Sequence, residues 1–190
     1  TPAVWAVSSN GTVNTLLATP TALLAGGAFT TMAGSIRNGL AALAYDNALC
    51  TAWNPDVQGT VNAMTLNNDT LYFGGEFTAV SGNDRSRLAA VNVSSGTLLN
   101  WAPVADAAVN DLALSPGLVH AVGGFSTIDG TERRYLAAVD AVTGALSAWS
   151  APAPEIGIAL IRSNGADGLY IGGDFQGLGW AERHRVAAFS

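Results

Sequence analysis

The sequence predicts an all-β protein, a β-propeller of four blades with four antiparallel strands each, and three repeating markers support this fold class. Tryptophans recur at intervals of 48 residues, at Trp5, Trp53, Trp101 and Trp149. A glycine pair followed by a phenylalanine recurs with nearly the same period, and its phenylalanines are Phe29, Phe77, Phe125 and Phe175. A short apolar run, such as Leu88-Ala89-Ala90-Val91, is the third marker. A fixed period of about 20 to 50 residues is typical of repeat architectures.

The second unit shows most clearly the four short strands that we expect in each repeat. The first covers residues 61–66, and the second, 71–78, is closed by a turn at 81–84. The third covers 87–93, and the fourth ends at 98–101. Short segments bounded by Gly, Asn, Asp and Pro are typical of hairpin meanders. No segment keeps a 3.6-residue apolar period, so no helix is expected, and four strands in about 45 residues are typical of one propeller blade.

Residues 1–190 are interpreted as a single propeller domain. The chain ends just after the third strand of the last unit and begins just before Trp5, which ends a fourth strand. We therefore expect the N-terminal strand to pair with the last blade and to close a four-blade ring, which would remove open sheet edges. The alternative is a four-blade segment of a larger propeller.

The order of motifs within one unit is specific enough to compare with known repeats. In the second unit it comprises Tyr72-Phe73-Gly74-Gly75-Glu76-Phe77-Thr78, Gly82, Arg85, Leu88 to Val91, Ser95-Gly96, Trp101 and Pro103. This order resembles the delta-sixty type of β-propeller repeat, which is abundant in large secreted or surface-attached bacterial proteins and has similar blades in fungal cell-surface polarity markers. The resemblance implies an extracellular, cell-surface or periplasmic location, and it brings no shared catalytic residue.

Two positions depart from this pattern. One residue is interpreted as missing within Gly123-Gly124-Phe125, and Asn47-Ala48 replaces the Ser/Thr-Gly turn of the first unit.

Residues that recur in every unit are interpreted as framework. We expect the phenylalanines in the core between blades, the glycine pairs at a close backbone approach or a bulge, and the tryptophans between neighbouring sheets. Stacking of sugars is the alternative for the tryptophans. A recurring arginine is expected to clamp turn carbonyls or a carboxylate, with an anion site as the alternative. These arginines are Arg37, Arg85, Arg133 and Arg183. Cys50 aligns with Leu98 and Leu146 and is interpreted as a small buried apolar side chain.

Three amides share one position on the first strand, where we align Ile158 in the fourth unit. They are Asn14, Asn62 and Asn110. If this strand is innermost, the amides line the central channel. They would then either bind water, an ion or a small polar ligand, or cap backbone groups at the inner edge of each blade.

Trp180 falls outside the tryptophan period and lies in a glycine-rich turn, close to His184 and other charged residues. An aromatic side chain on a turn favours exposure, so we expect Trp180 and His184 to form a contact for a ligand or partner. The alternative is that Trp180 covers a ring edge or contacts a neighbouring subunit.

Charge and residue spacing argue against several classes of function. The net charge is −6 and all eight basic residues are arginines, which gives no electrostatic reason to bind nucleic acid or an anionic membrane. No apolar run approaches the length of a membrane span, so no membrane insertion is expected. The two histidines lack metal-ligand spacing, and no phosphate loop or nucleophile elbow occurs. We therefore predict no metal, no cofactor and no catalytic residue.

The sequence favours a non-catalytic interaction or scaffold module, secreted or exposed at the surface, with a protein partner or with self-assembly as a subunit of a larger extracellular assembly. The alternative is binding of a carbohydrate or small polar ligand by the channel or by the Trp180 loop. A third hypothesis is a glycosidase-like enzyme, which would need carboxylates such as Asp106, Asp111 and Glu155 to converge in one cleft.

Overall fold

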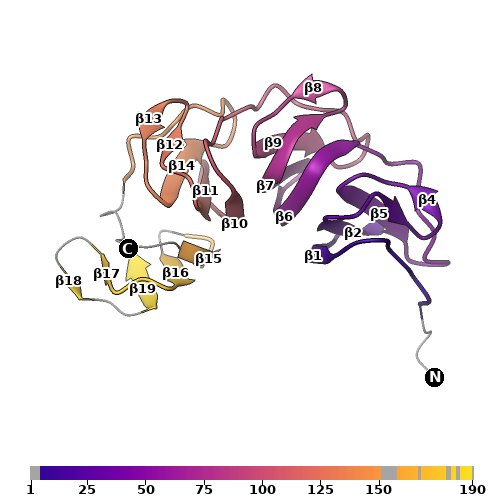
Figure 1. Ribbon diagram of the computed structural model, residues 1–190, viewed down its shortest axis with the longest axis horizontal. Coiled ribbons are helices and arrows are strands. Elements are labelled where there is room, and N and C mark those ends of the chain that lie inside the picture. Colours follow the sequence, from indigo (N-terminus) through magenta and orange to yellow (C-terminus); the bar gives the residue numbers. More distant parts are fainter. Residues whose placement is uncertain (1–4, 151–157, 167, 179–180, 183–184, 190) are drawn as a thin grey trace.

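A computed structural model describes residues 5–150, 158–166, 168–178, 181–182 and 185–189. The longer strands in this part of the chain form four successive antiparallel sheets, which we call blades 1 to 4 and which are arranged along an open arc (Figure 1). Blade 1 contains β1 (Val13–Ala18), β2 (Ala22–Gly27) and β5 (Leu40–Ala44); blade 2 contains β6 (Val57–Asn67), β7 (Thr70–Val80) and β9 (Leu88–Asn92). Blade 3 contains β10 (Val109–Ser115), β11 (Leu118–Gly123) and β14 (Leu136–Asp140); blade 4 contains β15 (Ile158–Ser163), β16 (Leu169–Gly173) and β19 (Val186–Phe189). The prediction of an all-β chain is confirmed for these residues.

A short hairpin comes after the second strand of every blade. The hairpins pair β3 (Thr31–Met32) with β4 (Ser35–Ile36), the end of β7 with β8 (Asn83–Asp84), β12 (Thr127–Ile128) with β13 (Thr131–Glu132), and β17 (Gly177–Leu178) with β18 (Ala181–Glu182). In blade 2 the turn residues Ser81 and Gly82 both have positive φ, at 50° and 72°. Two positive φ values define the type I′ turn that matches the twist of a two-stranded hairpin.

The fourth strand of each blade, predicted from the sequence, is reduced to a single bridge in blades 1 to 3. These bridges join Leu43 to Cys50, Val91 to Leu98 and Val139 to Leu146. In blade 2 the strand cannot extend past Leu99, because Arg85 donates a hydrogen bond to the Leu99 carbonyl and Trp101 turns away to the next blade. The prediction of a full fourth strand at the outer edge is therefore wrong for blades 1 to 3, where a bridged edge follows the third long strand.

A bulge occurs at the same point in the first hairpin of all four blades, and it explains the recurrence of one glycine. In blade 2 the register shifts between Val61 and Ala63, and Gly75 lies opposite Val61. A Cβ on Gly75 would lie 3.0 Å from the Val61 Cα and closer still to the Thr60 carbonyl oxygen. In blade 3 Gly123 pairs with Val109 in the same way, so Gly124 replaces Glu76 and no residue is missing there. The gap expected in this motif was a misalignment.

Each blade packs on its neighbours through two different faces. We call the face toward the preceding blade the leading face and the face toward the following blade the trailing face. Three apolar clusters fill the boundaries between blades 1 and 2, blades 2 and 3, and blades 3 and 4. Phe77, Phe125 and Phe175 are fully buried in these boundaries, and Phe29 is buried on the leading face of blade 1.

The arc is open, so the expected closed ring is not formed by the part of the chain described here. Blade 1 and blade 4 stand apart at the two ends of the arc (Figure 1). Trp5 packs beside Tyr45 of blade 1, with 6.1 Å between ring centroids. Each tryptophan of the repeat packs toward the blade that comes after it, so this contact is the same in an open arc and in a closed ring. The strand that we expected to pair with the last blade precedes Trp5, and residues 1–4 lie outside the described residues.

Candidate functional site

The concave side of the arc is formed by the inner strands β1, β6, β10 and β15 (Figure 1). A groove of about 480 Å³ runs along it. Its lining comes from all four blades: Thr15, Leu16, Met64, Thr65, Leu66, Asp111, Leu112, Ala113, Leu114, Arg162, Ser163 and Gly165. The volume falls in the range of about 300–1,000 Å³ of small-molecule sites. The groove lies on the inner strands, where the channel was expected, but Asn14, Asn62 and Asn110 are not among its lining residues.

The three asparagines on these strands connect one blade to the next. Asn14 donates to the Val61 carbonyl and to the Asn62 side chain, both at 3.1 Å. Asn62 donates in turn to the Val109 carbonyl at 3.0 Å, and Asn110 lies 3.5 Å from the Ile158 carbonyl. Their amide donors are therefore bound by backbone within the arc.

The fourth unit was misaligned at this position. The register of blade 4 places Ile158 opposite Gly173, as Val109 lies opposite Gly123. The residue equivalent to the asparagines is therefore Ala159, one residue later than expected, because the segment before β15 carries an extra residue. The row of amides ends at blade 4, which has no side-chain donor for a further blade at this position.

Replacing Asn62 by alanine is expected to lower the free energy of unfolding by about 1–2 kcal/mol, because it removes one acceptor and one donor at a partly buried boundary. Asn110→Ala is the matched control, with an expected loss of about 0.5 kcal/mol or less, because its single bond is long. Urea unfolding of the two variants measures the difference. Equal losses would contradict the role of Asn62 as a two-sided connection.

The boundary between blades 3 and 4 has an ionic connection as well. Asp111 on β10 accepts hydrogen bonds from the Ile161 backbone N–H at 2.9 Å and from the Arg162 guanidinium. Asp111 is mostly covered and Arg162 is largely exposed. The Asp111 carboxylate therefore connects blade 3 to blade 4, and the Arg162 guanidinium stays accessible from the groove.

The recurring arginines donate to main-chain carbonyls. Arg85 donates to its neighbour Asp84 at 2.8 Å and to Leu99 at 3.1 Å, and Arg37 and Arg133 make the same pair of bonds in blades 1 and 3. The bonds tie each short hairpin to the segment that leads to the next blade. Arg183 lies outside the described residues.

One position on the second strand differs between blades and controls how each boundary is filled. In blade 2 it is Tyr72, which packs edge-on against Trp101 at 5.0 Å and donates to the Ala141 carbonyl at 2.6 Å. In blade 3 it is His120, which packs edge-on against Trp149 at 4.9 Å. In blade 1 the position is Leu24, whose smaller side chain has no hydroxyl group.

His120 makes the boundary between blades 3 and 4 sensitive to pH. Burial lowers its pKa from the ordinary 6.5 to about 4, so the folded protein holds the ring neutral. The unfolded chain takes up the proton first, so the stability that this group contributes is complete above about 6.5 and is lost as the pH falls through 4. We expect stability to decline in this window and His120→Gln to flatten the decline, as measured by urea midpoints at pH 7 and pH 4.5.

A carboxylate comparison separates this effect from general acid unfolding. Hydrogen bonds from the backbone N–H and the hydroxyl group of Thr143 hold the pKa of Asp140 below its ordinary 3.8, so its contribution to stability is lost at lower pH than that of His120. An unchanged pH profile between pH 7 and pH 4.5 in the His120→Gln variant would show that another group controls this window.

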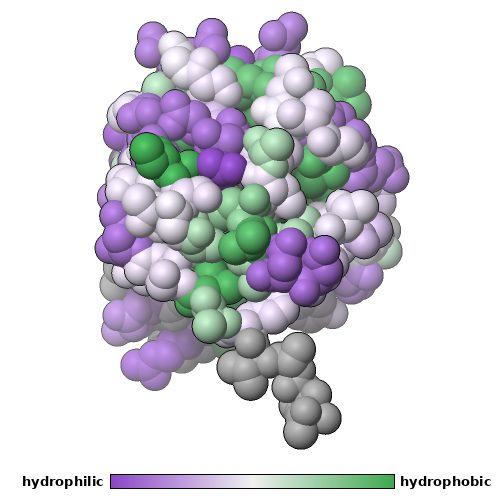
Figure 2. Space-filling view, turned by 90° about the vertical axis from the view of Figure 1, so that its right-hand side faces the viewer, coloured by the Kyte–Doolittle hydropathy of each residue, from purple (hydrophilic) through white to green (hydrophobic). Residues whose placement is uncertain are grey.

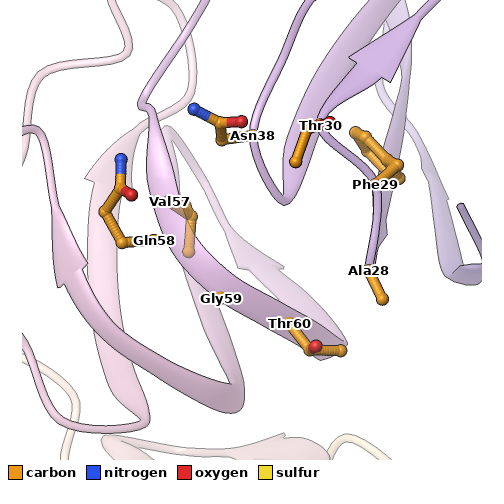
Figure 3. A pocket seen from close by; sticks show the side chains of 8 residues that line it. All are labelled: Ala28, Phe29, Thr30, Asn38, Val57, Gln58, Gly59 and Thr60. Atoms are coloured by element: carbon orange, nitrogen blue, oxygen red, sulfur yellow. The ribbon is translucent and has the colours of Figure 1, made fainter. Parts of the chain in front are cut away.

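Two hollows lie at the boundary between blades 1 and 2. One, of about 470 Å³, is where Leu24 stands in place of the tyrosine of the next boundary. It is lined by Thr19, Thr21, Ala22, Leu24, Ala42, Thr51, Ala52, Trp53, Val93, Ser94 and Ser95. The other, of about 200 Å³, lies between the segment around Phe29 and strand β6 (Figure 3). Figure 3 shows the amides of Asn38 and Gln58 at one end of it and Thr60 at the other.

The remaining site predictions cannot be placed. Trp180 and His184 lie outside the described residues, so their contact role stays a prediction. In the ranges that the structure does describe, no group of three or more His, Cys, Asp or Glu side chains could hold a metal ion. The same ranges contain no helix long and apolar enough to cross a membrane.

The sequence did not lead us to predict the exposed apolar residues on the two end faces of the arc. Val13 and Leu16 on the leading face of blade 1 are 38% and 59% exposed, whereas their equivalents Val61 and Met64 in blade 2 are 0% and 9% exposed. The trailing face of blade 4 is also uncovered: Leu160, Tyr170 and Val186 are 55%, 50% and 68% exposed. A repeat alignment could have marked these positions, because their equivalents inside the arc all face a neighbouring blade.

Apolar surface is also visible on the side of the molecule that holds blade 1. Figure 2 looks at the side that holds blade 1 and shows apolar surface in the middle of the molecule between polar patches. Other exposed apolar side chains of blade 1 include Ile36 and Leu49. A single exposed apolar side chain is common on proteins, so the grouped ones at the ends of the arc carry more information.

Comparison with known proteins shows the fold. No protein-family model and no curated protein matches the chain. Among solved structures it is similar to the computationally designed Ika4 protein, with 13% identity and a TM-score of 0.64, over 96% of this chain and 92% of that chain. It is similar to the Neurospora crassa Pan2 WD40 domain, with 12% identity and a TM-score of 0.57, over 92% of this chain and 46% of that chain.

A weaker similarity is to BamB from Moraxella catarrhalis, with 14% identity and a TM-score of 0.44, over 83% of this chain and 54% of that chain. The first two matches and the four successive sheets agree on architecture. The chain has an all-β, propeller-like fold.

Proposed function

We propose that this protein is a non-catalytic interaction or scaffold module that binds a protein partner through the two uncovered blade faces at the ends of its arc. The observation that supports this most strongly is the exposure of apolar side chains at these faces. Equivalent side chains inside the arc, such as Val61 and Tyr72, are buried. Grouped apolar surface is typical of sites where proteins meet.

The expected setting is extracellular or on a cell surface, as part of a larger assembly. This part of the proposal rests on the resemblance of the repeat to blades of secreted and surface-attached bacterial proteins. The framework residues of each blade leave the turns free to vary, which suits a scaffold.

Site-specific photo-crosslinking tests the binding surface. A photoreactive amino acid at position 16 or 160 is expected to give defined adducts with a protein in cells of the source organism. The same residue at position 142, an 86% exposed valine away from both faces, is the control and is expected to give none. Adducts of equal yield at all three positions, or at none, would contradict the proposal. Turnover of glycosides by the purified protein would contradict its non-catalytic character.

A second candidate is the binding of a small hydroxylated ligand, such as a sugar, in the 470 Å³ hollow between blades 1 and 2. The hollow combines the Trp53 ring with five hydroxyl side chains, and it lacks the tyrosine that fills the next boundary. Leu24→Tyr is expected to fill it and to abolish binding in a panel of mono- and disaccharides monitored by tryptophan fluorescence. Binding that survives in this variant would exclude the hollow as the site.

A further inference from the structure

The three boundaries inside the arc show which residues of a trailing face meet which residues of a leading face. Because the units repeat, the residues at the same repeat positions on the trailing face of blade 4 and the leading face of blade 1 can be paired in the same way. These two faces are the ones that the arc leaves uncovered. The identity of their partner, which rests on the proposed function, can be inferred from these pairs.

The first pair involves a glycine on the trailing face. A Cβ on Gly26 would lie 2.9 Å from Cγ1 of Val61, and one on Gly74 would lie 2.5 Å from Cγ1 of Val109, so in both cases the valine of the next blade occupies the space. The equivalent Gly172 in blade 4 has only atoms of its own blade within 4 Å. The valine missing beside it corresponds to Val13, which is exposed in blade 1.

The second pair joins the inner strands. Asp111 of blade 3 contacts the backbone of Ile161 in blade 4. The registers make Leu160 the equivalent of Asp111, and they make Leu16 the equivalent of Ile161. Leu160 and Leu16 are both more than half exposed. Their equivalents at the boundary between blades 2 and 3, Ala63 and Leu112, are both buried in the apolar cluster of that boundary.

The third pair is aromatic. Tyr72 of blade 2 packs edge-on against Trp101 and donates to the Ala141 carbonyl of blade 3. Tyr170 occupies the position of Tyr72 in blade 4 and is half exposed. On the leading face of blade 1, Trp5 is the equivalent of Trp101, and the Tyr45 carbonyl is the equivalent of the Ala141 carbonyl.

We propose that the trailing face of blade 4 binds the leading face of blade 1 in a second copy of this chain, through the pairs Gly172–Val13, Leu160–Leu16 and Tyr170–Trp5. The second copy makes the same contact in return, so that two arcs close one ring. The match of 92% of this chain to 46% of the Pan2 WD40 domain supports this, because the arc corresponds to about half of that chain. The contact is head to tail, since the two faces that meet are different.

Two single variants and their mixture test the proposal. Leu160→Asp disables only the trailing face, and Leu16→Asp disables only the leading face. Native mass spectrometry of the wild type is expected to give twice the 19.3 kDa mass of one chain, and each variant alone is expected to give the single mass. An equal mixture of the two variants is expected to restore the double mass, because one intact trailing face still meets one intact leading face.

Val142→Asp is the control for a general effect of an added charge, and it is expected to keep the double mass. A wild type that stays at the single mass at the highest concentration measured would overturn the proposal. Failure of the mixture to associate would overturn the head-to-tail contact, and a series of masses above two chains would overturn the closed two-copy ring. If crosslinks from positions 16 and 160 then lead to a different protein, the interaction function stands and only the identity of the partner is wrong.

Discussion

Replacing Gly123 by alanine is expected to lower the free energy of unfolding by about 3 kcal/mol, because no space exists for a side chain at the bulge. A Cβ there would lie 2.9 Å from the Val109 Cα, and closer still to the Ala108 carbonyl oxygen. Both are backbone atoms at the start of β10, the innermost strand of blade 3. They cannot move without breaking the hairpin of β10 and β11. Urea unfolding monitored by circular dichroism measures the loss.

The neighbouring residue supplies the control. Gly124 has no atom within 4 Å of the position that its Cβ would take, and its φ is not in the left-handed region. Gly124→Ala is therefore expected to leave stability unchanged or slightly raised, since alanine restricts the unfolded chain. A similar loss in both variants would show that the bulge is not the cause.

Replacing Phe125 by alanine is expected to cost about 4 kcal/mol, because its ring is fully buried at the boundary between blades 2 and 3. The residues around it come from both blades, so the cavity would weaken the contact between them and not only the blade that carries the phenylalanine. The urea midpoint and the sharpness of the transition measure both effects.

Val142→Ala is the matched control in the same blade, since its side chain is 86% exposed, and we expect a change within about 0.5 kcal/mol. If Phe125→Ala lost no more stability than Val142→Ala, the boundary cluster would not be part of the core. A variant that lost stability in two separate steps would show that the blades unfold independently.

Much of the framework could be predicted from the repeat alone. The spacing of Trp53 and Trp101 predicts the length of a unit, and their neighbours predict three of its strands. The hairpin turn at Ser81 and Gly82 was also predictable, because its residues suit that turn. Local turn chemistry and apolar patterning act within one unit, so sequence shows them directly.

Contacts between units were harder to predict. The fourth strand reads as a strand because Leu98 and Leu99 are apolar, but Arg85 takes the carbonyl that the ladder would need. The error at Ile158 arose because the extra residue before β15 lies where no marker recurs. The exposure of Tyr170 depends on whether another blade packs against blade 4, and its residue type is the same as that of the buried Tyr72.

Footprinting of tyrosines by hydroxyl radicals tests most directly two claims: that the arc of a single chain is open, and that its two end faces bind those of a second copy. In dilute solution, where single chains dominate, Tyr170 is expected to be modified readily and the 3% exposed Tyr72 to be protected. At high concentration Tyr170 is expected to become protected as well, while a tyrosine-containing peptide added to every sample reports on the radical dose. Protection of Tyr170 already in the single chain would contradict the account, because it would mean that the four blades close a ring on themselves.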